Sequence, residues 1–197
     1  MVILMARIVV VTGSPGVGKT TLVKSLGGDP SFRIMSVADE MLPLAAEKGW
    51  AKHRDELRYM DNEQITTLRN YAFEKIAASD GNVIIDTHAT VEQNGRYVPG
   101  LPGDAMEKFK GLMAGIIYID ASTDDILARR ESDKERVREK EARHIIHMQR
   151  AINISALSYY SSYLNVPLYV VTNRQGRLDE SMEKFKSCIY DAFKVKK

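Results

Sequence analysis

The feature that most constrains this chain is a glycine-rich turn between an apolar run and a helical segment. Residues 13–20 read GSPGVGKT, which is the G-x-x-x-x-G-K-T pattern known as Walker A. The β-branched run Ile8–Val11 precedes the turn, and a segment of helical character follows from Thr20. Glycines let the backbone curl until its N–H groups face one anion, and the helix N-terminus adds the positive end of its dipole. The sequence therefore predicts a loop that binds the phosphates of a nucleoside triphosphate.

Two side chains of this loop have roles that follow from the pattern. Lys19 supplies a compact cation for the β- and γ-phosphates, and the Thr20 hydroxyl is placed to bind Mg²⁺. Asp86 ends an apolar run, and an acidic residue at the end of a buried strand can orient Mg²⁺ through its water shell. Asp120 ends another such run and competes for this role, but we prefer Asp86 because Thr87 and His88 follow it and can line a pocket. The predicted ATP-binding residues are Gly13, Ser14, Pro15, Gly16, Val17, Gly18, Lys19, Thr20 and Thr21, and the predicted metal-binding residues are Thr20 and Asp86.

Five short apolar runs alternate with longer helical segments along the chain. This alternation is typical of βαβ units, in which helices cover both faces of a parallel sheet. Right-handed crossovers then place the functional site at the carboxyl ends of the strands. We therefore predict an α/β fold with a doubly wound, five-stranded parallel sheet. The predicted strands are Arg7–Thr12, Arg33–Val37, Asn82–Asp86, Gly115–Asp120 and Pro167–Thr172.

Helices are predicted between these strands, and one of them has a clear start signal. Asp61 and Gln64 stand three residues apart, as in a capping box. The segment Gln93–Gly103 is rich in glycine and proline and predicts an ordered loop. The predicted helices are Thr20–Leu26, Asp39–Lys48, Asp61–Ser79, one that begins with Asp124–Arg130, a long one that ends at Leu164, and Ser181–Val195.

Five polar or aromatic residues of the long helix have structural explanations. Tyr159, Tyr160 and Tyr163 form an aromatic stripe, for which we expect a core or a subunit contact. His144 and His147 stand three residues apart, but no other His or Cys stands at metal-ligand spacing. We therefore expect the two histidines to be helix-surface or interface residues.

The composition is that of a globular protein from a reducing compartment. A chain of 197 residues is long enough for one domain with a full core. The formal net charge of +2 gives no field that favours nucleic acid or an anionic membrane, and the single cysteine, Cys188, excludes an internal disulfide. The apolar start Met1–Ala6 is too short for a membrane span and has no signal-peptide pattern. We expect a cytoplasmic protein without membrane or nucleic-acid partners.

A dense run of charges suggests a segment that can close over bound phosphates. Twelve of the fifteen residues from Arg129 to Arg143 are charged, seven of them basic and five acidic. Arg129 and Arg130 end a predicted helix, and Arg136 and Arg138 follow a short polar stretch. Guanidinium groups on a mobile flap can stabilise a transferred phosphoryl group. The alternative is a solvated helix face with i,i+4 ion pairs. We favour the flap because the same chain carries a phosphate loop.

The remaining sequence separates classes of nucleotide-binding protein. A GTPase needs an Asn-Lys-x-Asp stretch and an Asp-x-x-Gly switch, and neither stands at the expected place. A translocating ATPase usually needs a larger domain, so a small-molecule kinase is the economical choice. Arg54 and Arg58 stand four residues apart and would share a helix face and hold an acceptor phosphate; the alternative is surface pairing with acids such as Asp55. Three hypotheses stay open: adenylate kinase, a kinase for another nucleoside monophosphate or small metabolite, and a P-loop ATPase or regulatory module.

Several of these segments together resemble the archaeal-type adenylate kinases. They are GSPGVGKTT at 13–21, R-D-x-x-R at 54–58, DTHAT at 86–90, Y-x-P-G-L-P at 97–102 and the arginine segment at 129–138. They occur in order over essentially the whole chain. Many kinases share the phosphate loop, whereas the combination of DTH with PGLP is much more specific. One departure is Glu139, where the family pattern leads us to expect an aspartate.

The resemblance implies the reversible reaction of ATP and AMP to two ADP, with Mg²⁺ as cofactor. It implies one domain of the P-loop nucleoside monophosphate kinase type over 1–197, with an acceptor segment at about 36–80 and a short helical lid at about 131–143. It also implies a cytoplasmic, commonly trimeric protein without lid zinc, and the single cysteine agrees with the latter. The implied AMP-binding residues are Ser36, Met41, Arg58, His88, Gly100, Leu101 and Pro102, and the implied catalytic residues are Lys19, Arg129, Arg130, Arg136 and Arg138.

Overall fold

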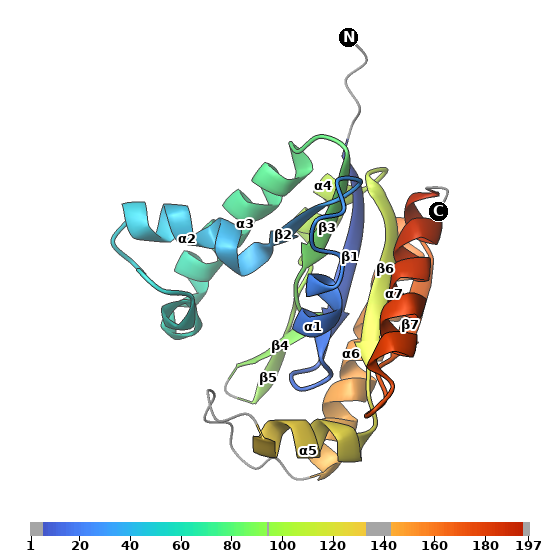
Figure 1. Cartoon of the computed structure of the whole chain (residues 1–197). Helices are drawn as coiled ribbons and strands as arrows, with labels where there is room; N and C mark the ends of the chain where they lie inside the picture. Colours follow the sequence, from blue (N-terminus) through green and yellow to red (C-terminus); the bar gives the residue numbers. More distant parts are fainter. Residues whose placement is uncertain (1–5, 94, 133–142, 195–197) are drawn as a thin grey trace.

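The centre of the fold is a parallel sheet of five strands in the order β2-β3-β1-β6-β7 (Figure 1). The computed structural model describes residues 6–93, 95–132 and 143–194, with the backbone alone at positions 58, 93 and 132. The predicted doubly wound sheet is confirmed, and each predicted strand end lies within two residues of the observed one. The strands are β1 (Arg7–Gly13), β2 (Arg33–Ser36), β3 (Asn82–Asp86), β6 (Met113–Asp120) and β7 (Leu168–Thr172).

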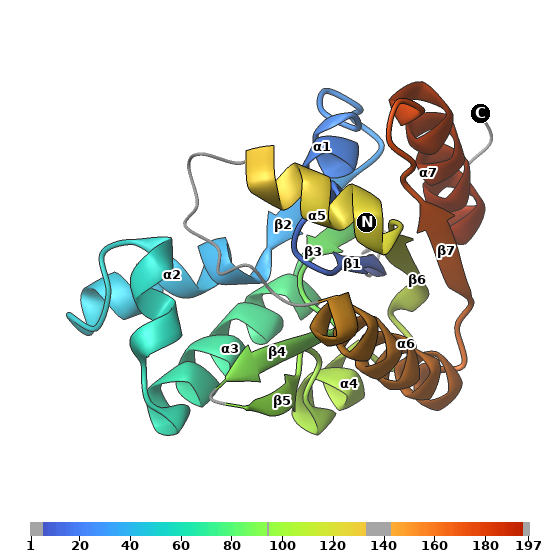
Figure 2. The ribbon, with the colours of Figure 1, turned by 90° about the horizontal axis from the view of Figure 1, so that it is seen from below.

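Helices cover both faces of this sheet, as Figure 2 shows. Ile8 and Val10 of β1 belong to one core cluster, whereas Val9 and Val11 belong to the other. Runs of valine and isoleucine are what a sheet between two helical layers requires, because successive side chains point to opposite faces. The cluster with Ile8 and Val10 includes residues of α2 (Val37–Glu47), α3 (Asn62–Ala77), α4 (Gly103–Phe109) and α6 (Arg143–Leu164). The cluster with Val9 and Val11 includes residues of α1 (Lys19–Lys24), α5 (Thr123–Ser132) and α7 (Leu178–Phe193).

The start of α3 confirms the predicted capping box. Asp61 is the N-cap, and its carboxylate accepts a hydrogen bond of 2.8 Å from the backbone N–H of Gln64. The Gln64 side chain accepts one of 3.3 Å from the backbone N–H of Asp61 in return. These bonds satisfy two N–H groups near the helix start, so α3 begins one residue after the predicted start.

The prediction of an ordered loop over Gln93–Gly103 is wrong. The chain there forms an antiparallel hairpin of β4 (Thr90–Gln93) and β5 (Arg96–Pro99), with Gln93 opposite Arg96, and then enters α4. The Asn94-Gly95 dipeptide in the sequence is a typical two-residue hairpin signal. The glycine and proline content of the whole segment favoured a loop instead. The helix α4 was missed because seven residues are too few to show a helical period.

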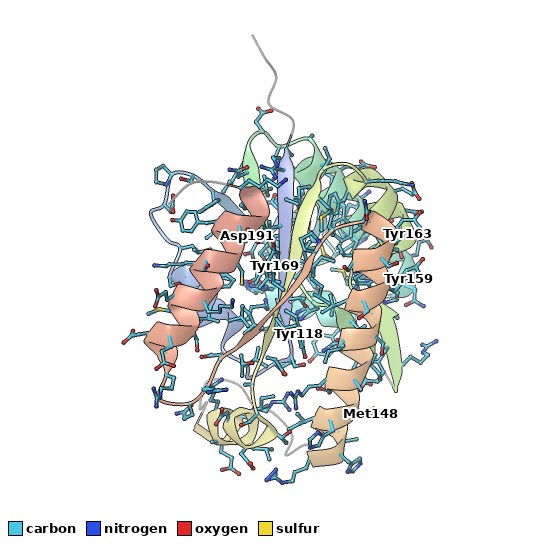
Figure 3. All side chains as sticks on the ribbon, turned by 90° about the vertical axis from the view of Figure 1, so that its right-hand side faces the viewer. Tyr118, Met148, Tyr159, Tyr163, Tyr169 and Asp191 are labelled. Atoms are coloured by element: carbon cyan, nitrogen blue, oxygen red, sulfur yellow. The ribbon has the colours of Figure 1, made fainter. Side chains whose placement is uncertain are left out.

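The aromatic stripe of α6 divides between core and surface. Tyr160 is 3% exposed and packs in the core, whereas Tyr159 and Tyr163 are 56% and 37% exposed. Figure 3 shows Tyr159 and Tyr163 together on one side of α6, with Met148 further along the same helix. Among the described helices, none has both the length and the hydropathy that a bilayer span needs.

The strand order fixes where a ligand can bind. The chain leaves β1 toward β2 on one side of the sheet and leaves β6 toward β7 on the other side. The two connections diverge, and open α/β sheets bind ligands outside the carboxyl ends of the strands at such a point. The glycine-rich turn follows β1 and therefore lies at this edge of the sheet.

Candidate functional site

The phosphate loop runs from the end of β1 to the start of α1. Gly16 and Gly18 have φ values of 91° and 86°, a left-handed conformation that side chains disfavour. A Cβ atom on Gly18 would also lie 2.4 Å from Nδ2 of Asn173, and one on Gly13 would lie 2.7 Å from the carbonyl oxygen of Ile119. Conformation therefore requires glycine at positions 16 and 18, and close contacts require it at positions 13 and 18.

Lys19 and Asp86 meet where the phosphate loop lies beside the end of β3. Their side chains form an ion pair and are only 14% and 15% exposed. The parallel register pairs Val11 of β1 with Asp86 of β3, which brings the strand end beside the loop that follows β1. Thr20 comes next on α1 and is exposed. A hydroxyl and a carboxylate are hard oxygen ligands, so Thr20 and Asp86 suit Mg²⁺.

Asp120, the alternative to Asp86, is occupied by another partner. Arg150 of α6 donates hydrogen bonds of 2.8 Å and 2.5 Å to the two carboxylate oxygens of Asp120. The hydrogen bond to Asp120 raises the pKa of Arg150 above its ordinary value. A bidentate pair of this kind fixes both groups. The structure therefore brings Asp86, rather than Asp120, to Lys19.

Two of the four predicted lid arginines contact the phosphate loop from α5. Arg129 donates hydrogen bonds to the carbonyl oxygens of Val17 and Asn173, at 3.1 Å and 3.0 Å. Arg130 donates two bonds, of 3.1 Å and 2.8 Å, to the carbonyl oxygen of Pro15. These cations therefore hold carbonyl oxygens of the phosphate loop. Arg136 and Arg138 lie outside the described residues.

The acceptor side begins at β2, next to β3. Ser36 ends β2 opposite Asp86, and its hydroxyl accepts a hydrogen bond of 3.2 Å from Arg54. Arg54 opens a 3₁₀ helix, η1 (Arg54–Tyr59), rather than an α-helix. The expectation that Arg54 and position 58 share a helix face is therefore wrong, because three residues per turn do not align positions four apart. The side chain of Arg58 lies outside the described part of the structure.

Gly100, directly after β5, lies against the residues that follow β3. Its N–H donates a hydrogen bond of 2.8 Å to the carbonyl oxygen of Ala89. A Cβ atom on Gly100 would lie 1.7 Å from the carbonyl oxygen of His88, so no other residue fits. Tyr160 of α6 donates a further bond of 3.1 Å to Ala89. The backbone from His88 to Ala89 is thus held against Gly100.

His88 lies on this turn and is an exposed residue. Desolvation by the surrounding protein, together with repulsion from Lys19, Arg54 and Arg69, lowers the pKa of His88 to about 4. The imidazole is therefore neutral at neutral pH. Two of these three cations are themselves paired with carboxylates, Lys19 with Asp86 and Arg54 with Asp39.

Three other predicted acceptor residues differ in accessibility. Met41 and Leu101 are 4% and 1% exposed and belong to the hydrophobic core, whereas Pro102 is half-buried at the start of α4. The side chains of Met41 and Leu101 therefore pack inside the protein. They have almost no surface with which to touch a ligand.

Three residues near the site were not singled out from the sequence. Asn153 of α6 donates a hydrogen bond of 3.0 Å to Ser14, and Asn173 donates one of 2.8 Å to the carbonyl oxygen of Val17. Arg69 of α3 is half-buried, and burial lowers its pKa below the ordinary value. An asparagine at a core-facing helix position and a polar residue directly after a buried strand are signals that point to Asn153 and Asn173.

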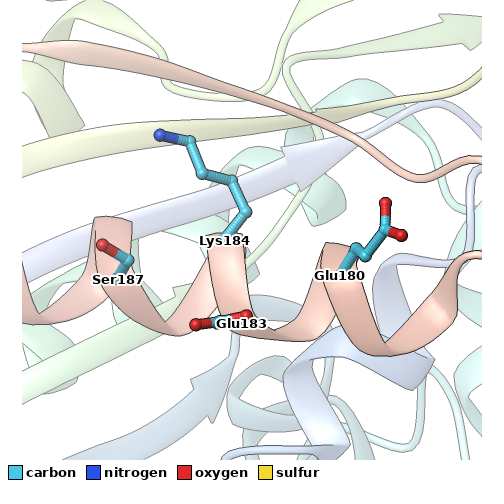
Figure 4. Close-up of a pocket in the computed structure, with 4 residues that line it drawn as sticks. All are labelled: Glu180, Glu183, Lys184 and Ser187. Carbon is cyan, nitrogen blue, oxygen red and sulfur yellow. The ribbon is translucent and has the colours of Figure 1, made fainter.

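Two hollows on the described surface lie away from the pair of Lys19 and Asp86. One is lined by Glu180, Glu183, Lys184 and Ser187 of α7 (Figure 4). The other lies between α7 and the exposed edge of β7 and includes Val170. No residue of the phosphate loop lines either hollow, so the site rests on the convergence of Lys19 and Asp86.

Comparisons with known proteins agree with this geometry. The family model of the AAA domain matches residues 12–147. The adenylate kinase of Methanopyrus kandleri is 32% identical over 189 residues, which cover 92% of this chain and 96% of that protein. The adenylate kinase of Methanothermobacter thermautotrophicus is 29% identical over 185 residues, with coverage of 93% and 99%.

Solved structures of kinases share the fold at lower sequence identity. A shikimate kinase from Bacteroides thetaiotaomicron aligns with a TM-score of 0.53 at 15% identity, over 93% of this chain and 98% of that chain. A shikimate kinase from Acinetobacter baumannii in complex with shikimate aligns with a TM-score of 0.51 at 16% identity, over 97% and 96%. Identities this low show the fold alone.

Proposed function

The chain belongs to the AAA-domain family and to the adenylate kinases, and from this premise we propose that it transfers the γ-phosphoryl group of ATP to AMP. The bond between the γ-phosphorus and its bridging oxygen breaks, and a bond to an oxygen of the AMP phosphate forms, so that two ADP result. The observation that carries the proposal is the meeting of Lys19 with Asp86. The donor loop follows β1 and the segment implied to bind the acceptor follows β2, and the two strands flank β3, which ends in Asp86.

On the donor side, residues 13–21 hold the triphosphate. Backbone N–H groups of the glycine turn and the start of α1 face the phosphate oxygens, and Lys19 exchanges its contact with Asp86 for the β- and γ-phosphates. Thr20 and Asp86 hold Mg²⁺, directly or through water. The ion, when bound, neutralises charge on the β- and γ-oxygens.

On the acceptor side, AMP lies between the end of β2 and the Gly100–Pro102 turn. Ser36, Arg58 and His88 contact the nucleotide, while Met41 and Leu101 pack in the core. No general base is needed, because the attacking phosphate oxygen is already anionic. The protein contributes position, charge and the exclusion of water.

The lid segment completes the site in the closed state. Arg129 and Arg130 bring α5 to the loop through carbonyl contacts, and Arg136 and Arg138 then reach the phosphates. We further propose one catalytic domain over 1–197, a cytoplasmic location and a homotrimeric assembly. The exposed tyrosines of α6 are candidates for the subunit contact.

A coupled assay tests the proposed reaction. ATP with Mg²⁺ is offered with AMP, CMP, UMP, GMP or small hydroxylated acceptors, and ADP is measured. We expect ADP with AMP, and chelation of Mg²⁺ by EDTA should lower the rate at least about 100-fold because charge on the phosphates is no longer neutralised. Turnover with another acceptor but not with AMP contradicts the proposal. AMP-independent hydrolysis that RNA stimulates would indicate a regulatory ATPase instead.

Arg138→Ala is expected to lower kcat by about 10- to 1,000-fold while raising the KM for AMP by less than about fivefold. The reason is that a lid cation contacts the phosphoryl group mostly in the closed transition state, so its loss affects kcat more than ground-state binding. Steady-state kinetics with both nucleotides varied measures the two constants. Unchanged turnover, or an effect on KM alone, contradicts this role.

A further inference from the structure

One face of α6 carries three polar side chains that reach three different parts of the site. Arg150, Asn153 and Tyr160 are spaced three and seven residues apart, and the buried Leu157 lies between the last two. Arg150 binds Asp120 at the end of β6, and Tyr160 binds the carbonyl oxygen of Ala89 after β3. Asn153 lies between them.

Asn153 joins the two halves of the site through a single planar amide. Its Nδ2 donates a hydrogen bond of 3.0 Å to the hydroxyl of Ser14 in the phosphate loop. Its Oδ1 accepts one of 2.7 Å from the hydroxyl of Thr90, the first residue of β4. Thr90 pairs with Pro99, the neighbour of Gly100. The Asn153 amide therefore links the phosphate loop to the β4–β5 hairpin, which leads into the Gly100–Pro102 turn.

Burial makes this bridge difficult to replace. Asn153 and Ser14 are 7% and 3% exposed, so water has little access to their polar atoms. A buried polar group that loses its partner pays the full cost of desolvation, which favours the bridged arrangement over others. The amide is rigid and uses both ends, so it fixes the Ser14 and Thr90 hydroxyls relative to each other.

We infer that Asn153 is a positioning residue that keeps the phosphate loop and the β4–β5 hairpin in register for phosphoryl transfer. The inference rests on the proposed function, because it concerns how donor and acceptor meet. In-line transfer needs reacting atoms about 3–3.5 Å apart, and a misplacement of about 1 Å can lower the rate about 100-fold. Asn153 touches neither nucleotide in this scheme and acts through Ser14 and Thr90.

The test separates the two arms of the bridge. Thr90→Val removes the acceptor arm alone and should raise the KM for AMP about 3- to 10-fold, with the Kd for ATP within about twofold of wild type. Asn153→Leu removes both arms and should lower kcat about 10- to 100-fold and weaken ATP binding as well. Thr90→Ser keeps the hydroxyl and should restore the wild-type KM. Ser155→Ala, on the exposed side of the same helix, is the matched control and should change neither constant.

A double-mutant cycle decides whether Thr90 acts through Asn153. In the Asn153→Leu background, Thr90→Val should change the KM for AMP by less than about twofold, because its partner is already gone. Equal effects of Thr90→Val in both backgrounds would overturn the inference. So would variants that lose only melting temperature, with kcat and KM per folded molecule unchanged, since a merely structural role predicts that result.

The same experiment distinguishes failure of the inference from failure of the proposed function. Wild-type protein that forms no ADP from ATP and AMP contradicts the function. The Kd for ATP, measured by calorimetry without AMP, still tests the Ser14 arm in that case. An unchanged Kd in Asn153→Leu would overturn the inference independently of turnover.

Discussion

Lys19→Ala is expected to lower kcat by about 100- to 10,000-fold while the protein stays folded. Lys19 is the side-chain cation of the phosphate loop, and its side chain is only 14% exposed. A fixed charge in such a place stabilises the developing charge on the phosphates, and the loss of one such group typically costs a factor of 100 or more. The fold should survive because Lys19 belongs to neither core cluster.

Circular dichroism and steady-state kinetics check both parts of this prediction. The Asp86 carboxylate loses its partner in the variant, but its side chain is 15% exposed and keeps some access to water. Lys24→Ala is the matched control, because Lys24 is an exposed lysine of the same helix and should leave kcat within about twofold. Equal activity of Lys19→Ala and the control would refute the role of Lys19.

Gly100→Ala is expected to destabilise the protein and to weaken AMP binding together. The added Cβ would lie 1.7 Å from the carbonyl oxygen of His88 and 2.9 Å from that of Ala89, both of which are backbone atoms. The two segments must separate, which breaks the hydrogen bond of 2.8 Å from Gly100 to Ala89. Overpacking and a lost buried bond together cost about 2–4 kcal/mol, which corresponds to a fall in melting temperature of roughly 5–15 °C for a chain of this size.

The KM for AMP should rise at least about tenfold in Gly100→Ala, since His88 and the Gly100–Pro102 turn move apart. Calorimetry and kinetics at 25 °C, below the lowered transition, measure the two effects separately. Gly103→Ala is the control, because a Cβ atom at that position would meet no atom within 4 Å apart from its chain neighbours and the backbone of its own helix. A wild-type melting temperature for Gly100→Ala would contradict the close contact.

Local chemistry explains which elements could be predicted from the sequence. The strand Asn82–Asp86 and the N-cap Asp61 were predicted correctly, because a buried apolar run and a capping box are signals within a few residues. The hairpin at 90–99 was missed although Asn94-Gly95 is a local signal. The 3₁₀ form of η1 was missed for a different reason, since short helices have no clear period.

Some residues of the candidate site can likewise be identified from a local motif, and others only from their partners in space. The loop motif identified Lys19 and its ligand class, because G-x-x-x-x-G-K-T encodes a backbone shape as well as a side chain. The choice of Asp86 over Asp120 depended on partners. Arg150 stands 30 residues after Asp120 in the chain, and only the packing of α6 against β6 brings them together.

The sequence by itself determined the class of fold, the phosphate loop and the family, since each depends on residues that are neighbours in the chain or on motifs in fixed order. Only the tertiary structure decided which side chains meet. It placed Asp86 beside Lys19, set Gly100 against His88, and brought Asn153 to both Ser14 and Thr90. The physical reason is that hydrogen bonds and steric contacts depend on separation in space to within a fraction of an ångström. That separation follows from how strands and helices pack, which no local pattern specifies.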